Sequence, residues 1–162
     1  MRRLLIVCVC IVAFAGPVVG GTLDASPRLN QVRINLGGLL GGASSGVYGV
    51  DVAYGRIVAS WLGWNISAWS LYTEDTFGAG GGVSADLYLL GPAPTGVFLN
   101  TRVGVVSGQI YSIPSVTAQI GMSLGVQHVW PGGFLLRVGS GGSLVLNYRF
   151  VPRMLLSIGY AF

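Results

Sequence analysis

Strict alternation between apolar residues and small or polar residues is the feature that most constrains the fold of this chain. From Val116 to Gln127, across twelve residues, the even positions are apolar and the odd positions are threonine, glutamine, glycine or serine. Successive side chains of a strand point to opposite faces, so a period of two predicts a β-strand rather than a helix. The rival interpretation is a polytopic helical protein. It relies on length alone, because 103–127 carries no charge and could span a bilayer as a helix.

The same alternation recurs along the rest of the chain and predicts further strands. They are 31–36, 49–54, 62–68, 83–89, 99–105, 134–150 and 156–162. Glycine, serine and proline separate them, and proline cannot donate to a strand ladder. The predicted connections are 38–45, 74–82, 91–96, 107–115, 130–133 and 151–153. Gly78 to Gly82 is interpreted as a loop, because it does not follow a strand and open a helix as a nucleotide-binding motif does.

Composition indicates which environment such strands occupy. Hydrophobic residues make up 52% of the chain and charged residues 9%, whereas a soluble domain is nearer a quarter charged. The chain has too few charges for the wet face of a soluble sheet, and its arginines are scattered, which argues against nucleic acid as a partner. In a bilayer the outer face must be apolar, and the sheet must close so that every backbone group is paired. We therefore expect an all-β fold, a closed antiparallel transmembrane β-barrel.

The strand count depends on how 134–150 is interpreted. Counted run by run it is two strands, which gives a total of nine, but single-chain bacterial barrels have an even number of strands. Apolar residues keep one parity across Gly141 and Gly142, so we interpret the segment as one long strand with a glycine kink. This predicts eight strands. If the two glycines form a turn, the alternative is ten.

The N-terminus has the pattern of an export signal. Arg2 and Arg3 precede an uninterrupted apolar run over 4–16, which is too short to span a bilayer and fits the core of a secretory signal. We predict a signal peptide over 1–20 and a barrel domain over 21–162, with cleavage after Ala15 as the alternative. Both cysteines lie inside the signal, so the mature chain contains none.

The last residues carry a resemblance to a known class. Leu156 to Phe162 alternates and ends on an aromatic residue, and with the signal and the strands it resembles the small bacterial outer-membrane β-barrels of the OmpA, OmpX and OmpW type. The resemblance implies location in the bacterial outer membrane, among outer-membrane lipid. It also implies that Ile158, Tyr160 and Phe162 form the signal read by the barrel-insertion machinery, after delivery by periplasmic chaperones. The short loops depart from many members of the class and weaken an adhesive role.

Most charged residues of the predicted strands have inward parity. We expect a polar cluster in the lumen made of Arg33, Asp51, Asp86, Arg102, Arg137, Asn147 and Arg149. An arginine at the lipid midplane costs about 2–4 kcal/mol, so inward placement is expected. The cluster either plugs the lumen or lines a narrow path or ligand pocket, and its excess of arginine would favour anions. Trp69 also has inward parity and could plug the lumen or line a pocket.

Aromatic and histidine residues of the outer wall form a second group of candidates. Trp61, Trp64, Trp130 and Tyr160 are expected at the membrane–water interfaces, where amphipathic rings collect. His128 and Ser140 share outward parity, and some outer-membrane lipid-modifying enzymes use such residues. An interfacial histidine is the favoured interpretation, because no carboxylate is placed to orient His128. A single histidine and no mature cysteine exclude the usual zinc sites.

These observations lead to one expected function and two alternatives. We expect a non-enzymatic integral outer-membrane barrel that forms a narrow channel or a route for small or apolar molecules. The first alternative is a structural or surface-interaction barrel with a plugged lumen, and the second is a lipid-modifying enzyme. No cofactor, metal or catalytic residue is predicted. Whether a small-molecule ligand binds, and whether the barrel is a monomer or a small oligomer, stays open.

Overall fold

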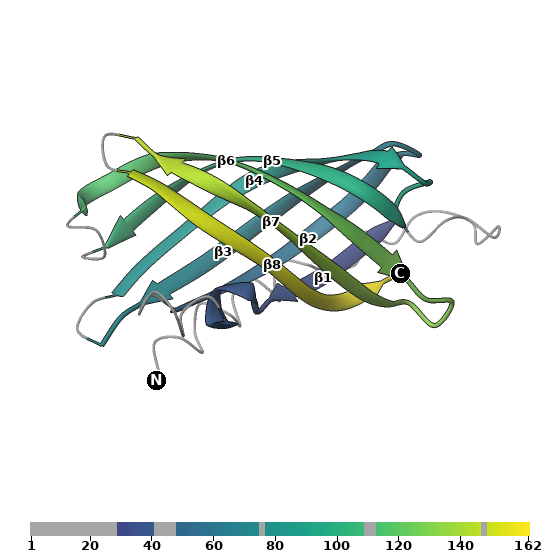
Figure 1. The fold of residues 1–162 in the computed structure, drawn as a ribbon, viewed down its shortest axis with the longest axis horizontal. Helices are drawn as coiled ribbons and strands as arrows, with labels where there is room; N and C mark the ends of the chain where they lie inside the picture. Colours follow the sequence, from purple (N-terminus) through teal and green to yellow (C-terminus); the bar gives the residue numbers. More distant parts are fainter. Residues whose placement is uncertain (1–28, 41–47, 75–76, 109–112, 147–148) are drawn as a thin grey trace.

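Eight antiparallel strands form a closed barrel in the computed structural model, which describes residues 29–40, 48–74, 77–108, 113–146 and 149–162 (Figure 1). Each strand pairs with its neighbours in the chain, and the last strand pairs with the first. The strands are β1 (Asn30–Asn35), β2 (Tyr48–Ala59), β3 (Leu62–Tyr72), β4 (Phe77–Leu90), β5 (Gly96–Gly108), β6 (Ile113–Val129), β7 (Phe134–Val145) and β8 (Arg149–Ala161). The predicted closed barrel of eight strands is confirmed. The predicted signal peptide lies outside the described residues and stays a prediction.

The two ends of the barrel differ. The end that carries the start of β1 and the C-terminus is here called the terminal end, and its connections are 60–61, 91–95 and 130–133. The opposite end is called the loop end, and its connections are 36–47, 73–76, 109–112 and 146–148. Two predicted turns are confirmed at the terminal end. Gly91 and Gly96 have φ of 86° and 139°, a conformation that glycine tolerates, and the Gly133 N–H donates to the Trp130 carbonyl at 2.8 Å.

One predicted connection is wrong, because 151–153 lies within β8. Two others are too long. β4 begins at Phe77, so Gly78 to Gly82 are strand residues, and β5 and β6 extend into 107–115. Segment 134–150 is also not one strand, because β7 ends at Val145 and Phe150 belongs to β8. Gly141 and Gly142 lie within β7 and form no turn, in agreement with the prediction. The connection falls at 146–148 instead.

The position of Pro152 explains why a proline fits inside β8. The Leu156 carbonyl accepts from the Leu36 N–H, and the Leu156 N–H donates to the Asn35 side chain, so Leu156 points its polar backbone groups toward β1. Backbone groups alternate sides along a strand, so residue 152 points the same way. There β1 has already ended, and the N–H that proline lacks is not needed by a neighbouring strand.

The two faces of the wall have opposite character. Many apolar side chains are exposed on the outside, among them Ile66, Val83, Val103, Met122, Leu124, Val138 and Ile158. Buried polar residues fill the inside, among them Gln31, Asn65, Asp86, Asn100, Gln127 and Arg137. This is the inverse of a soluble protein and is the arrangement that a lipid environment requires. In the part of the chain that the structure describes, no helix has the length and apolar character needed to cross a membrane.

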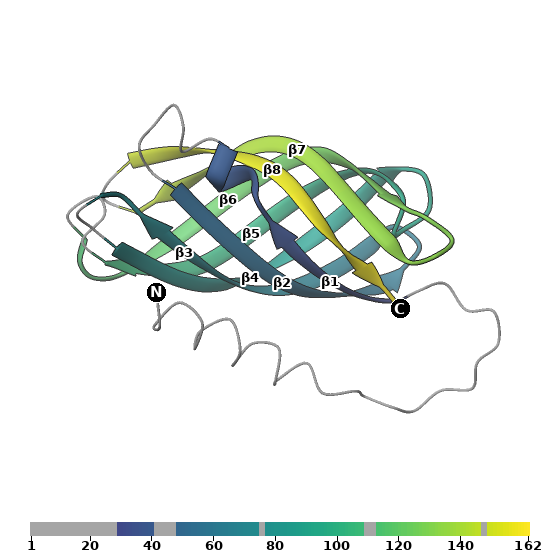
Figure 2. The ribbon, with the colours of Figure 1, turned by 90° about the horizontal axis from the view of Figure 1, so that it is seen from below.

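One short helical turn interrupts the pattern of strands. Residues 37–40 follow β1 and lie between β2 and β8 at the loop end, where β1 no longer separates those two strands (Figure 2). β1 has six residues, whereas β8 has thirteen. The helical turn therefore occupies part of the wall that a longer first strand would fill.

Candidate functional site in the barrel lumen

A buried carboxylate organises the middle of the lumen. Asp86 of β4 is fully buried, and both of its oxygens accept from Arg137 of β7 at 2.7 Å. Asn65 and Asn100 donate to the same carboxylate at 2.9 and 2.7 Å, and Arg33 lies 3.6 Å from it. These five residues, here called the Asp86 cluster, come from five different strands. A two-pronged arginine–carboxylate pair with additional donors is the arrangement that makes a buried ion pair tolerable.

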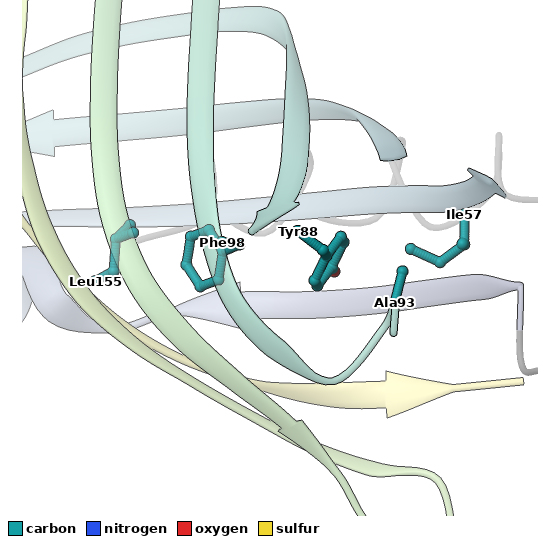
Figure 3. Close-up of a cluster of buried hydrophobic side chains, with 5 residues drawn as sticks. All are labelled: Ile57, Tyr88, Ala93, Phe98 and Leu155. Carbon is teal, nitrogen blue, oxygen red and sulfur yellow. The ribbon is translucent and has the colours of Figure 1, made fainter. Parts of the chain in front are cut away.

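Apolar and amide side chains close the lumen between the Asp86 cluster and the terminal end. Ile57, Tyr88, Ala93, Phe98 and Leu155 form a buried cluster (Figure 3). Leu155 is the member farthest from the terminal end and also lines a small space beside Asp51. The Arg137 guanidinium lies over the Phe98 ring, 3.5 Å from its centroid, which joins this cluster to the Asp86 cluster.

Gln127 completes the closure by linking groups from different parts of the barrel. Its amide nitrogen, which has two hydrogens to donate, lies within hydrogen-bond distance of three acceptors. They are the side-chain oxygen of Gln31 at 3.1 Å, the Tyr88 hydroxyl at 3.1 Å and the Pro94 carbonyl at 2.6 Å. The Gln127 carbonyl oxygen accepts from Arg137 at 3.3 Å. Gln127 is fully buried, so the terminal end is filled by interlocked side chains.

A second charged cluster lies nearer the loop end. Asp51 of β2 pairs with Arg102 of β5 at 3.0 Å and with Arg153 of β8. Arg102 also donates to the Ser67 hydroxyl at 2.6 Å, and its guanidinium lies 3.8 Å from the centroid of the Trp69 ring. These five residues are here called the Asp51 cluster. Trp69 is buried inside the barrel, as its parity indicated.

The structure brings together five of the seven predicted lumen residues. Arg33, Asp86 and Arg137 lie in the Asp86 cluster, and Asp51 and Arg102 lie in the Asp51 cluster. Asn147 lies outside the described residues. Arg149 is the first residue of β8, and its side chain is not among those described.

Sequence reasoning missed Arg153. It was assigned to a connection because Pro152 precedes it. The signal that could have found it is parity, since Arg153 continues the inward series of Leu155 and Ser157. With Arg153 included, four arginines and two aspartates form ion pairs inside the barrel among the described residues, which leaves an excess of two positive charges.

Two cavities flank the Asp51 cluster. Between the two charged clusters lies a space of about 20 Å³, which is room for about one water molecule. A larger cavity of about 650 Å³ lies toward the loop end, and Asp51, Trp69, Arg102 and Arg153 form part of its lining. The lumen is thus filled toward the terminal end and hollow toward the loop end.

Aromatic side chains gather at two levels of the outer wall. Trp61, Trp64, Trp130 and Tyr160 are all exposed and lie toward the terminal end, and Phe134 contacts Trp130 at a ring distance of 5.2 Å. A second group lies at the loop end, and its members are Tyr48, Tyr72, Phe77 and Phe150. From Trp64 to Tyr72 the strand rises about 26 Å, or about 20 Å along the axis of a tilted barrel. The spacing is close to the ~25 Å apolar band of outer-membrane barrels.

His128 and Ser140 are not brought together. Both are exposed on the outer wall, but His128 pairs in register with Leu136 and Ser140 with Leu124, so about 13 Å of strand separates them. The His128 ring packs edge-on against Trp130 at 4.4 Å. Among the described residues, no group of three or more histidine, cysteine, aspartate or glutamate side chains could hold a metal ion.

Comparison with solved structures places this architecture. The barrel is similar to the outer membrane protein Ail of Yersinia pestis, solved in a phospholipid bilayer nanodisc, with a TM-score of 0.53. The fold is that of an eight-stranded outer-membrane barrel. The likeness covers 83% of this chain and 99% of Ail at 14% identity, so it establishes the fold alone. No protein-family model and no curated protein sequence matches the chain.

Proposed function

We propose that this protein is a non-enzymatic integral barrel of the bacterial outer membrane whose lumen is plugged, so that it works as a binding or surface-interaction scaffold rather than as a channel. The observation that carries this proposal is the pair of filled layers formed by the Asp86 cluster and by Gln127 with Tyr88. Between the charged clusters only about 20 Å³ is open. These observations favour the plugged barrel over the narrow channel that the sequence led us to expect.

The energetics of the plug support the same choice. A conducting path would have to separate Asp86 from Arg137, and breaking a buried ion pair by removing one partner costs about 3–5 kcal/mol. Gln127 would also have to leave the acceptors that its amide nitrogen contacts on Gln31, Tyr88 and Pro94. Small outer-membrane barrels place short turns in the periplasm and loops outside. On that pattern the terminal end faces the periplasm, and the hollow loop end faces outward.

We expect a barrel with a plugged lumen to show no ion conductance. Refolded mature chain, Gly21 to Phe162, is expected to give no reproducible conductance steps in a planar bilayer. A quadruple variant, Asp86→Ala with Arg137→Ala, Tyr88→Ala and Gln127→Ala, removes side chains from both filled layers and is expected to produce small steps. The quadruple variant is the positive control for insertion. Reproducible steps from the unaltered chain would overturn the plugged-barrel proposal and restore the channel.

We expect substitution of the C-terminal aromatic residue to impair assembly of the barrel in cells rather than its stability. Ile158 and Tyr160 are exposed on the outer face of β8, and Phe162, the residue after β8, is exposed as well, so none of the three is part of the filled interior. We expect Phe162→Ser to reduce the amount of folded barrel in cells several-fold, while refolding into detergent is unchanged. Serine keeps the backbone pairing of residue 162 with Asn30.

A matched control for this variant is available at the same end of the barrel. Phe134 is 49% exposed and Phe162 is 55% exposed, but Phe134 begins β7 and is not part of the predicted signal. Phe134→Ser is expected to leave assembly in cells near its normal level. Equal defects in both variants would mean that loss of an outer-wall aromatic, not of a signal, is responsible.

A further inference from the structure

The loop-end cavity joins the lumen to the outer wall. Its lining includes the inward residues Trp69 and Arg102 and also the outward residues Phe150 and Met154, which are exposed on the outer face of β8. A cavity confined to the lumen would touch inward residues alone. This cavity therefore reaches past the edge of a strand.

The short first strand creates that edge. β1 ends at Asn35, opposite Ser157 of β8 and Asp51 of β2. Within the described residues, 149–155 of β8 and 48–50 of β2 have no partner strand on the sides that face each other. The helical turn 37–40 lies between these edges, as Figure 2 shows.

The helical turn packs against both edges through glycine. A Cβ added at Gly37 would overlap the Met154 carbonyl of β8, and one added at Gly38 would lie 2.6 Å from the Gly49 carbonyl of β2. Because neither glycine has a side chain, the turn brings its backbone close to the strands and contributes little volume. Gly37, Gly38 and Gly49 all line the cavity.

Unpartnered polar atoms mark the inner part of the cavity. Arg102 Nε, Gln119 Oε1 and Ser143 Oγ are buried, and none has a hydrogen-bond partner in the part of the chain that the structure describes. All three residues line the cavity. The side chain of Arg102 is 5% exposed, and an unmet donor of a buried charged group is costly to leave without a partner. A ligand with acceptor oxygens would satisfy this donor only after a small shift of the guanidinium, because Nε has almost no accessible surface as the side chain stands. Gln119 Oε1 is an acceptor and forms no hydrogen bond with an anion.

The charge of the same region favours an anion. Arg102 and Arg153 share a single carboxylate, Asp51, so one positive charge is left without a counterpart in this cluster. The Arg153 side chain is 20% exposed and lies at the cavity. The Arg153 side chain can turn toward a bound anion without leaving Asp51 buried and unpaired, because Asp51 keeps its ion pair with Arg102.

Much of the remaining lining is apolar. The apolar members are Val50, Leu71, Phe150, Val151, Pro152 and Met154, with Trp69 on the inner side, and the further polar members are Asn35, Ser70 and Ser140. A volume of about 650 Å³ is within the ~300–1,000 Å³ range of small-molecule sites. A small inorganic anion would leave most of these apolar surfaces without contact, whereas a hydrocarbon chain would cover them.

We propose that the loop-end cavity binds an anionic amphiphile, with its carboxylate or phosphate group on Arg102 and Arg153 and its acyl chain directed past β8 toward the lipid-facing wall. This inference rests on the proposed plugged barrel, because a blind cavity holds a ligand that an open pore would pass. The shared chemistry is an anionic head on an acyl chain. Its source is either the surrounding membrane or a free amphiphile outside the cell.

The test uses the indole N–H resonances of the mature barrel in phosphatidylcholine nanodiscs. Trp69 lies in the lumen, whereas Trp61, Trp64 and Trp130 are exposed on the outer wall and report simple partitioning into the bilayer. Dodecyl phosphate is expected to shift the Trp69 resonance saturably, at one equivalent per barrel. Dodecanol and inorganic phosphate, which each carry half of the chemistry, are expected to need far higher concentrations.

Variants locate the site. Arg102→Gln and Arg153→Gln are each expected to weaken the binding of dodecyl phosphate roughly 10- to 100-fold, the effect of losing a hydrogen bond to a charged group. Arg56→Gln is the matched control, because Arg56 is an exposed arginine of the outer wall near the terminal end. If Arg102→Gln does not fold, Ser143→Leu fills the cavity without removing a charge and is expected to block binding equally.

The outcomes separate the claims. No saturable shift of Trp69 would overturn the inference, and inorganic phosphate binding as tightly as dodecyl phosphate would overturn the acyl-chain part. A lipid that copurifies from native membranes with the unaltered chain, but not with Arg102→Gln, would identify the membrane as the source. Binding of added dodecyl phosphate without such a lipid would identify a free amphiphile. The conductance measurement tests the plugged lumen separately from ligand binding. A barrel that neither conducts nor binds dodecyl phosphate would refute the ligand site and leave the plugged-barrel proposal standing.

Discussion

Asp86→Ala is expected to lower the free energy of unfolding by about 3–5 kcal/mol, because it removes one partner of a buried ion pair. Arg137 would keep its charge with no carboxylate nearby, and Arg33 would lose the same neighbour. Asn65 and Asn100 would lose their acceptor as well. Urea unfolding of the refolded barrel in detergent micelles, followed by tryptophan fluorescence, measures the change.

Two comparison variants make the prediction specific. Replacing the pair together, as Asp86→Leu with Arg137→Leu, is expected to recover part of the loss, since a buried pair exchanged for apolar side chains is often neutral. Asp51→Ala is expected to cost less than Asp86→Ala, because the Arg153 side chain beside it is 20% exposed and can turn to the cavity. Equal losses at Asp51 and Asp86 would show that burial at the Asp86 cluster is not the cause.

The Asp86 cluster also accounts for the register of the barrel. Its members come from β1, β3, β4, β5 and β7, and each points inward in the observed register. A slip of one residue would turn every side chain of a strand to the other face. For β4 it would place Asp86 in lipid, where a charge is expensive. The cluster therefore penalises wrong registers as well as filling the lumen.

The alternation of the sequence was enough to predict the architecture and most of the lumen. Inward parity identified Arg33, Asp51, Asp86, Arg102 and Arg137, because period two fixes which face a side chain occupies. It could not predict which residues meet. Asp86 and Arg137 lie 51 positions apart, and their contact depends on how far each strand is shifted against the next around the barrel.

Strand ends were harder to predict because glycine and proline occur both in turns and inside strands. At 151–153 the proline indicated a connection, but its missing N–H faces the edge that the short β1 leaves open. The loop-end cavity was not predictable for the same reason, since it depends on the length of β1 and on where 37–40 packs. These are properties of three segments together, and no local pattern contains them.

The glycines of β4 show the same ambiguity and give the last prediction. The sequence predicts a loop over Gly78 to Gly82, but these residues lie in β4, with Gly80 opposite Trp69. A Cβ at Gly80 would lie 2.5 Å from the Trp69 ring and 2.5 Å from the Val105 carbonyl. The inward glycine therefore provides the space that the buried indole occupies beside Arg102.

Gly80→Ala is accordingly expected to destabilise the barrel by about 1–3 kcal/mol, the usual cost of overpacking a filled interior. Gly81→Ala is the control one residue away. There a Cβ would meet only the Ser67 carbonyl, at an ordinary 3.4 Å, and it would point to the lipid face. Both changes remove the same backbone freedom from the unfolded chain, which alone would stabilise by about 0.4–1 kcal/mol. Urea unfolding should thus give opposite signs for the two variants, and a gain in stability at Gly80 would mean that Trp69 does not occupy the space described.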